Sequence, residues 1–281
     1  MPIFQAILMG FIQGLTEFLP VSSSGHLVLT ASLYKLFTGV ELIHNGPQEA
    51  FFDIILHVGT LVAIFVYFWN DIIDIVKKFI VACNNKKFDT NEAKIPLFII
   101  LSTIFTLIVV FPLKDIIEKL LVAPIWTGVF LLLTAGVLYS SEWISKKFPK
   151  KEEKMTVKRA ILIGLAQGLA IFPGLSRSGM TISTGLATGL DRVTCAKYSF
   201  LLSIPIILAA SLLYPLLEID LKDFAAFDWG AILVGFVVSA VVGYFCIKYF
   251  IKFLSKFSMN VFAYYCFAVG AMMIIGFGFF S

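Results

Sequence analysis

The chain has 281 residues, of which 59% are hydrophobic and 14% are charged, with a formal net charge of +4. Soluble globular proteins are about 45–50% apolar and about 25% charged, so this composition excludes an ordinary soluble enzyme. A helix that crosses a membrane needs about 20 mostly apolar residues, and the sequence contains several such segments. The composition therefore predicts an all-α polytopic membrane protein.

The first apolar region, residues 3–37, is interrupted by the motif PVSSSG at residues 20–25. Each half of this region has about 10–16 residues, which is too short to cross a bilayer and is typical of a re-entrant helix hairpin. Three uninterrupted apolar segments follow, at residues 51–69, 95–113 and 124–139. Each of them is long enough to be a transmembrane helix.

A basic stretch at residues 146–159 precedes a second apolar region, residues 160–190, which is interrupted by PGLSRSG at residues 173–179. Three further crossings are predicted at residues 198–214, 229–250 and 261–280. The second half thus has the same order of elements as the first. The expected fold has six transmembrane helices and two re-entrant hairpins.

The two interruptions are related in sequence. When residue n is compared with residue n+154, seven of the thirteen positions from 13 to 25 are identical. The identical pairs are Gln13 and Gln167, Gly14 and Gly168, Leu15 and Leu169, Phe18 and Phe172, Ser22 and Ser176, Ser24 and Ser178, and Gly25 and Gly179. An odd number of crossings per copy inverts the second copy, so the sequence predicts an inverted-topology repeat. Residues 1–145 form the first copy, 146–159 a cytoplasmic linker and 160–281 the second copy.

The Lys and Arg residues are unequally distributed if each hairpin returns to the side from which it enters. Seventeen of the 22 then share one face: Lys77, Lys78, Lys86, Lys87, Lys94, Lys146, Lys147, Lys150, Lys151, Lys154, Lys158, Arg159, Arg192, Lys197, Lys248, Lys252 and Lys256. The other face holds Lys35, Lys114, Lys119 and Lys222. Cytoplasmic loops carry an excess of Lys and Arg, so the first face is predicted to be cytoplasmic. The first hairpin then opens outward, and no nucleic-acid partner is expected for the basic linker.

Three ionisable residues lie in or beside the interruptions: Glu17, His26 and Arg177. An ionisable side chain at membrane depth costs about 2.5–3.5 kcal/mol, so such residues indicate function. Gln13 and Glu17 are four residues apart and share one helical face. The structural alternative is a buried ion pair between Glu17 and Arg177, although burial of an isolated pair is seldom compensated by the attraction between its charges.

The serine motifs at residues 22–25 and 176–179 each stand where a half-helix begins. Hydroxyl groups, free backbone N–H groups and the positive end of a helix together form an anion site, so two such turns with Arg177 between them predict a site for phosphate or diphosphate. The alternative is that each serine only caps its helix. The predicted phosphate-binding residues are Ser22, Ser24, Gly25, Ser176, Ser178, Gly179 and Thr181.

The three histidines differ in their sequence context. His26 follows the first serine cluster and is a candidate general base, nucleophile or leaving-group acid. His57 is either a packed core residue or a partner of a catalytic group, with packing the favoured reading, and Asp53 one turn earlier has the same ambiguity. His44 lies in the predicted outward loop, where we expect it to be solvated.

The stretches QGLTEFLPVSSSGH at residues 13–26, PGLSRSGMT at 173–181 and LHVGT at 56–60 carry a family resemblance. They resemble the motifs of the bacterial undecaprenyl-diphosphate phosphatases of the bacitracin-resistance type, and the resemblance covers essentially the whole chain. It implies hydrolysis of undecaprenyl diphosphate to undecaprenyl phosphate, which recycles the lipid carrier for cell-wall synthesis and confers bacitracin resistance. The implied location is the bacterial cytoplasmic membrane, with the active site facing outward.

The resemblance also implies a divalent cation, Mg²⁺ or Ca²⁺, for which Glu17 and Gln13 are the candidate ligands. Many family members have glutamate in place of Gln13. Arg177 and backbone amides would hold charge on the transferred phosphoryl group, while Ser23 and His26 would supply the nucleophile and its base, with the assignment between them open. The expected partners are the polyprenyl diphosphate substrate and membrane lipids, and the sequence leaves monomer and homodimer open.

A carrier is the alternative to an enzyme, because inverted repeats with broken helices also build the midplane sites of secondary transporters. A lipid-phosphate flippase or a small-anion transporter would use the same arginine and serines. Substrate binding alone does not require His26 and Glu17 beside the hydroxyl cluster, so these two residues favour the enzyme.

Overall fold

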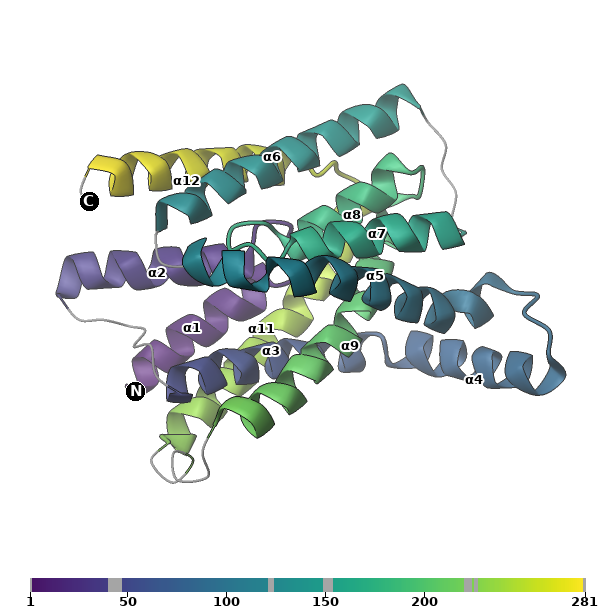
Figure 1. The fold of residues 1–281 in the computed structure, drawn as a ribbon, viewed down its shortest axis with the longest axis horizontal. Coiled ribbons are helices and arrows are strands. Elements are labelled where there is room, and N and C mark those ends of the chain that lie inside the picture. The colour runs from purple at the N-terminus through teal and green to yellow at the C-terminus, as the bar shows by residue number, and fades with distance from the viewer. Residues whose placement is uncertain are drawn as a thin grey trace.

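A computed structural model describes residues 2–39, 47–120, 124–148, 154–219, 224 and 227–279. The predicted positions of His44, Lys150, Lys151 and Lys222 lie outside the described residues. Helices dominate, and the described part contains no β-strand. The helices are α1 (Ile3–Thr16), α2 (Ser23–Thr38), α3 (Pro47–Tyr67), α4 (Trp69–Asn85), α5 (Asn91–Leu120), α6 (Pro124–Lys147), α7 (Val157–Leu169), α8 (Arg177–Ala187), α9 (Arg192–Glu218), α11 (Trp229–Leu254) and α12 (Asn260–Phe279) (Figure 1).

Six of the described helices are long and apolar enough to cross a membrane, which confirms the six predicted crossings. The candidate spans are Gln48–Tyr67, Asn91–Leu113, Ile125–Lys147, Arg192–Leu217, Trp229–Leu254 and Asn260–Phe277. Several are longer than predicted. The helix predicted to end at Tyr139 continues to Lys147, because the residues from 140 to 147 contain neither Pro nor Gly and nothing breaks the helix.

Both interrupted apolar regions form pairs of short helices, α1 with α2 and α7 with α8. In Figure 1 the α1–α2 pair approaches the middle of the molecule from one end and the α7–α8 pair approaches it from the other. The Ser22 Oγ accepts a hydrogen bond from the Gly25 N–H at 3.2 Å, and the Ser176 Oγ accepts one from the Gly179 N–H at 3.0 Å. Ser22 and Ser176 therefore cap α2 and α8, as the structural alternative for these serines predicted.

Each of the helices α1 and α7 packs against a long helix of the other half of the chain: α1 against α11 and α7 against α5. Small residues make this close approach possible. A Cβ atom on Gly14 would lie 2.7 Å from the backbone oxygen of Ser239, and one on Gly168 would lie 2.9 Å from that of Thr106. Gly14 and Gly168 are paired in the sequence repeat. The first helix of each half therefore packs against the other half of the chain at an equivalent glycine.

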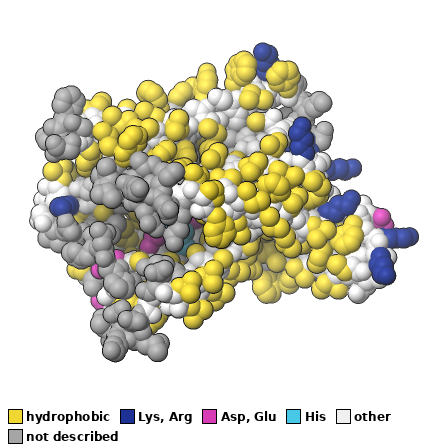
Figure 2. Space-filling view, in the orientation of Figure 1, with side chains coloured by type: hydrophobic (Ala, Val, Ile, Leu, Met, Phe, Trp, Pro, Cys, Tyr) yellow, Lys and Arg dark blue, Asp and Glu magenta, His cyan; other side chains and the backbone are white. Residues whose placement is uncertain are grey.

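Basic side chains gather at one end of the molecule, where α4 lies, α6 ends and α7 begins (Figure 2). Hydrophobic side chains cover much of the surface between the two ends. At the basic end Arg192 forms two hydrogen bonds with the buried carboxylate of Glu142, at 2.8 and 2.6 Å, and Glu142 also accepts the backbone N–H of Met259 at 2.8 Å. This ion pair joins α6, α9 and the segment before α12.

Candidate active site

The two serine turns meet at one cavity of about 430 Å³. Its walls come from the α1–α2 turn, α3, α5, the α7–α8 segment and α9. The polar residues that line it are Glu17, Ser22, Ser23, Ser24, Asp53, His57, Thr106, Gln167, Arg177 and Ser203. Its apolar lining is Leu107, Val110, Ala170, Ile171, Leu175, Ile206 and Ile207. Packing of the two halves therefore brings together turns that are 154 residues apart in the sequence.

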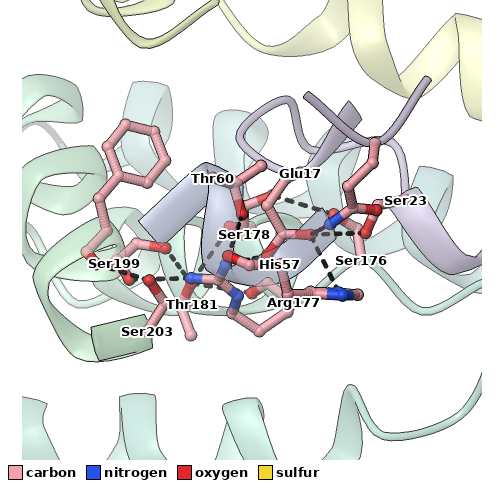
Figure 3. Close-up of polar contacts among 12 residues, drawn as sticks. Glu17, Ser23, His57, Thr60, Ser176, Arg177, Ser178, Thr181, Ser199 and Ser203 are labelled. Carbon is pink, nitrogen blue, oxygen red and sulfur yellow. Dashed lines mark hydrogen bonds and ion pairs between the residues drawn. The ribbon is translucent and has the colours of Figure 1, made fainter. Parts of the chain in front are cut away.

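The Glu17 carboxylate lies at the centre of the polar contacts (Figure 3). Its Oε1 atom accepts a hydrogen bond from the Arg177 guanidinium at 2.5 Å. Its Oε2 atom accepts the Ser23 hydroxyl at 2.7 Å and the Gln13 amide at 3.0 Å. The ion pair that the structural alternative predicted is present, but Glu17 also orients a serine hydroxyl that faces the cavity.

Arg177 is the first residue of α8 and reaches from the second turn to the first. Besides Glu17 it binds the backbone oxygen of Ser199 on α9, at 3.2 Å from Nη1. The guanidinium is a planar fork that matches the oxygens of a phosphate group, and its side chain is 20% exposed. Arg177 can therefore meet a phosphate in the cavity while Ser199 keeps its position fixed.

The other predicted phosphate-binding residues differ in their positions. The backbone N–H groups of Gly25 and Gly179 donate to the hydroxyls of Ser22 and Ser176. Ser22 and Ser24 line the cavity together with Ser23. Ser176, Ser178 and Thr181 are almost fully buried and bind partners within the protein. The Ser178 hydroxyl donates to the backbone oxygen of Leu19 at 2.9 Å and so ties the second turn to the first, whereas the Thr181 hydroxyl lies 2.6 Å from that of Ser199. Their contacts are structural, and a direct role for these three in phosphate binding stays a prediction.

His26 is not among the residues that line the cavity. Its Nδ1 atom lies 2.8 Å from the backbone oxygen of Ser22, and its Nε2 atom lies 2.7 Å from the hydroxyl of Tyr265 on α12. The two rings are also stacked, with centroids 5.5 Å apart. Both nitrogens of His26 thus have partners, and the role predicted for His26 in catalysis finds no contact with Glu17 or Ser23.

His57 lines the cavity from α3, where packing was the favoured reading of the sequence. Its Nδ1 atom lies 2.9 Å from the backbone oxygen of Asp53, and its Nε2 atom lies 3.7 Å from Glu17 Oε2. Asp53 also lines the cavity, with half of its side chain exposed. The sequence signal for His57 was its position within an apolar crossing, where an ionisable residue indicates function.

A divalent cation is compatible with the residues beside Glu17. Gln13 is fully buried, its amide nitrogen is bound to Glu17, and its Oε1 atom has no hydrogen-bond partner in the described structure. An amide oxygen and a carboxylate are ligands that Mg²⁺ and Ca²⁺ accept. The described residues contain no group of three His, Cys, Asp or Glu side chains that could hold a metal, so diphosphate oxygens would have to complete the coordination.

Comparisons with known proteins show the family of the chain. The model of a family described as "Bacitracin resistance protein BacA" matches residues 6–272. An undecaprenyl-diphosphatase of Methanosphaera stadtmanae is 43% identical over 97% of this chain and 97% of its own length. The undecaprenyl-diphosphatases of Halothermothrix orenii and Korarchaeum cryptofilum are 39% and 35% identical, over 98% of this chain and 98% and 99% of their own lengths. The chain belongs to the bacitracin resistance protein BacA family.

Proposed function

We propose that this chain hydrolyses undecaprenyl diphosphate to undecaprenyl phosphate and inorganic phosphate. The observation that carries the proposal is the contact of Ser23, Glu17 and Arg177 in a cavity built from both serine turns. These residues supply a nucleophile, an acceptor for its proton and a clamp for phosphate oxygens. The names of the relatives agree with that chemistry.

Ser23 is the nucleophile in this reaction. Its hydroxyl donates a hydrogen bond to Glu17 at 2.7 Å, so Glu17 can take the proton as the Ser23 oxygen forms a bond to the terminal phosphorus. The bond between that phosphorus and the bridging oxygen breaks, and the lipid monophosphate leaves. Water then attacks the phosphorylated Ser23 and releases inorganic phosphate. His26 lacks the contacts for either role.

Arg177 and the beginning of α2 hold the diphosphate. Without substrate the guanidinium binds Glu17, and a phosphate in the cavity offers it two further oxygens in the geometry that suits its fork. Residues 22–24 line the cavity at the N-terminus of α2, where the helix dipole favours an anion. When bound, Mg²⁺ or Ca²⁺ on Glu17 and Gln13 would neutralise further charge on the diphosphate.

The apolar wall of the cavity accommodates the start of the isoprenyl tail. Leu107 and Val110 on α5 face the same cavity as Ile206 and Ile207 on α9. In Figure 2 acidic and histidine side chains are visible below the surface of the molecule. The tail therefore leaves the polar site between α5 and α9 and passes directly into lipid.

The cavity opens to the outer face of the cytoplasmic membrane, in an inverted repeat with two re-entrant hairpins. Two observations support this arrangement. The basic end of the molecule is the cytoplasmic end by the positive-inside rule, and Asp53 lines the cavity from the half of α3 farther from that end. The equivalent packing of α1 on α11 and α7 on α5 fits two copies of opposite orientation.

Phosphate release from undecaprenyl diphosphate by the purified protein in detergent tests the function. Because no membrane separates two compartments there, a carrier would release none, whereas we expect the wild-type enzyme to release phosphate continuously. Ser23→Ala should lower kcat by at least about 10³-fold, while Ser255→Ala, which removes the same atom at the exposed end of α11, should not change it. Activity retained in Ser23→Ala would exclude Ser23 as the nucleophile.

A further inference from the structure

A groove of about 540 Å³ runs along the surface of α11 and shares no lining residue with the active-site cavity. Leu15 and Leu19 line it from the first half of the chain, and Phe245, Tyr249 and Phe253 line it from α11. Its described lining is hydrophobic apart from one thiol and the hydroxyl of Tyr249. Ligand sites have volumes of about 300–1,000 Å³ and a mostly apolar lining, so the groove has the size and character of a binding site.

The groove exists because α1 ends before the helix against which it packs. A Cβ atom on Gly14 would lie 3.0 Å from the backbone nitrogen of Gly243 on α11, and α1 ends at Thr16. From Gly243 to its end at Leu254, α11 rises by about 16 Å at 1.5 Å per residue. Half of the hydrocarbon core of a bilayer is about 15 Å thick. The part of α11 beyond α1 therefore has the length of one membrane leaflet.

Three exposed lysines stand at the far end of this stretch, at positions 248, 252 and 256. The ion pairs of the described residues include none of them. Lys252 follows Phe245 by seven residues and Tyr249 by three, so it lies on the face of α11 that lines the groove. Exposed tyrosines are common at the membrane interface, and Tyr249 stands one turn before this lysine.

α11 ends at the basic end of the molecule, because the backbone N–H of Met259 just beyond it binds Glu142 at 2.8 Å. The groove thus runs from the middle of the molecule, where α1 stops, to lysines at the level of the lipid headgroups. An apolar channel of leaflet length with positive charges at its outer end matches the two parts of an anionic phospholipid.

We propose that the groove binds one anionic phospholipid from the leaflet at the basic end of the molecule. An acyl chain lies along Phe245 and Tyr249 and reaches Leu19, while the headgroup phosphate meets Lys252 and Lys256. Lysines near a membrane surface attract anionic headgroups, whereas a zwitterionic headgroup carries no net charge to attract. The site is independent of the proposed hydrolysis.

The occupant differs from the isoprenyl tail of the substrate. Leu15 lines the groove and Glu17 lines the active-site cavity, and side chains two residues apart on a helix point about 160° away from each other. The two sites therefore lie on opposite sides of the first broken region. A tail that leaves the cavity between α5 and α9 does not enter the groove.

The lipid chain packs behind the segment that carries Glu17. The backbone oxygen of Leu15 accepts the Cys246 thiol at 3.1 Å, and that of Leu19 accepts the Ser178 hydroxyl at 2.9 Å. Contact of the lipid with the side chains of Leu15 and Leu19 adds to these two hydrogen bonds. A ligand that binds only the folded protein stabilises it, so the phospholipid should raise the unfolding temperature.

Native mass spectrometry tests the site in the purified full-length protein. The protein is reconstituted in phosphatidylcholine vesicles with increasing amounts of phosphatidylglycerol and extracted in a mild detergent, and we expect one retained phosphatidylglycerol per chain. Lys252→Gln and Lys256→Gln should each raise the phosphatidylglycerol content needed for half occupancy by about fivefold, which corresponds to about 1 kcal/mol per lysine. Lys158→Gln is the matched control, because it removes an exposed lysine of α7 at the same basic end, and it should change nothing.

A second pair of variants fills the groove without changing charge. Val241→Phe puts a ring into the lining, whereas Val237→Phe makes the same change one turn earlier on α11, at an exposed residue outside the groove. The rise in unfolding temperature on addition of phosphatidylglycerol should be lost in the first variant and kept in the second. Each variant is compared with itself before and after lipid addition, so a small loss of stability does not obscure the result.

Four outcomes would overturn the proposal. Equal retention of phosphatidylcholine would show only general contact with bilayer lipid, and an equal effect of Lys158→Gln would show only the overall charge of the basic end. Displacement of phosphatidylglycerol by undecaprenyl phosphate would assign the groove to the isoprenyl tail. A dimer that retains no lipid would assign it to a second copy of the chain. Phosphate release, measured separately, tests the proposed function whatever the groove binds.

Discussion

Substitution of Arg177 by lysine tests the phosphate clamp most sharply, because it keeps the charge and removes only the fork. Arg177 uses two different nitrogens, one for Glu17 and one for Ser199, and can present a planar pair of donors to phosphate. Lysine is a point charge on a flexible stem and can replace one of these contacts at a time. We therefore expect loss of at least one hydrogen bond to a charged group, which is worth about 1.5–3 kcal/mol.

A loss of that size lowers kcat/KM by about 10–150-fold, since each 1.36 kcal/mol is a factor of ten in rate. Arg177→Ala should lose more, about 10³-fold or above, because it also leaves the negative Glu17 beside the incoming diphosphate. Phosphate release over a range of substrate concentrations measures both values. Arg177→Lys with more than about a tenth of the wild-type kcat/KM would refute the clamp.

Arg192→Lys is the matched control for this experiment. Arg192 forms an ion pair with the buried Glu142 through two of its nitrogens, whereas Arg177 binds Glu17 through one, and Arg192 lies at the basic end of the molecule and away from the cavity. Its replacement should lower the thermal unfolding temperature and leave kcat/KM unchanged in the protein that remains folded. If both lysine variants lost activity in proportion to their stability, the effect at Arg177 would be structural.

Three further predictions concern the metal, the lipid tail and the topology. Glu17→Gln should raise the concentration of Mg²⁺ or Ca²⁺ that gives half-maximal activity and Gln13→Glu should lower it, so an unchanged titration in both would exclude these ligands. Ile207→Trp should lower kcat/KM for undecaprenyl diphosphate by about tenfold, because the larger side chain takes up space at the apolar side of the cavity. The kcat/KM for a short-chain isoprenyl diphosphate should change much less, and equal losses for the two substrates would place the tail elsewhere. The exposed Cys83 on α4 should react with an impermeant thiol reagent only after cells are permeabilised. Leu36→Cys in a Cys83→Ser background should react in intact cells, and the reverse pattern would show that the proposed orientation is wrong.

The sequence by itself determined the architecture of the chain, because the thickness of a bilayer sets the length of an apolar helix. The six crossings could be read from uninterrupted apolar segments, and the two broken regions from Pro and Gly within such segments. The family could be identified from the motifs around Glu17, Ser23 and Arg177. Hydropathy places a residue at a depth in the membrane, so it could mark these side chains as unusual before any contact was known.

Tertiary structure alone decided which of the polar residues share the cavity. His26 lies on α2 and His57 on α3. Successive residues of a helix point in directions about 100° apart, so the element packed against each face of the helix decides which partner a side chain contacts. Tyr265, 239 residues away in the sequence, holds His26, whereas the contact between α3 and the end of α1 puts His57 beside Glu17. In the same way the folded turn decides the partners of two adjacent serines that both line the cavity. The Ser22 hydroxyl accepts the Gly25 N–H of its own helix, whereas the Ser23 hydroxyl donates to Glu17.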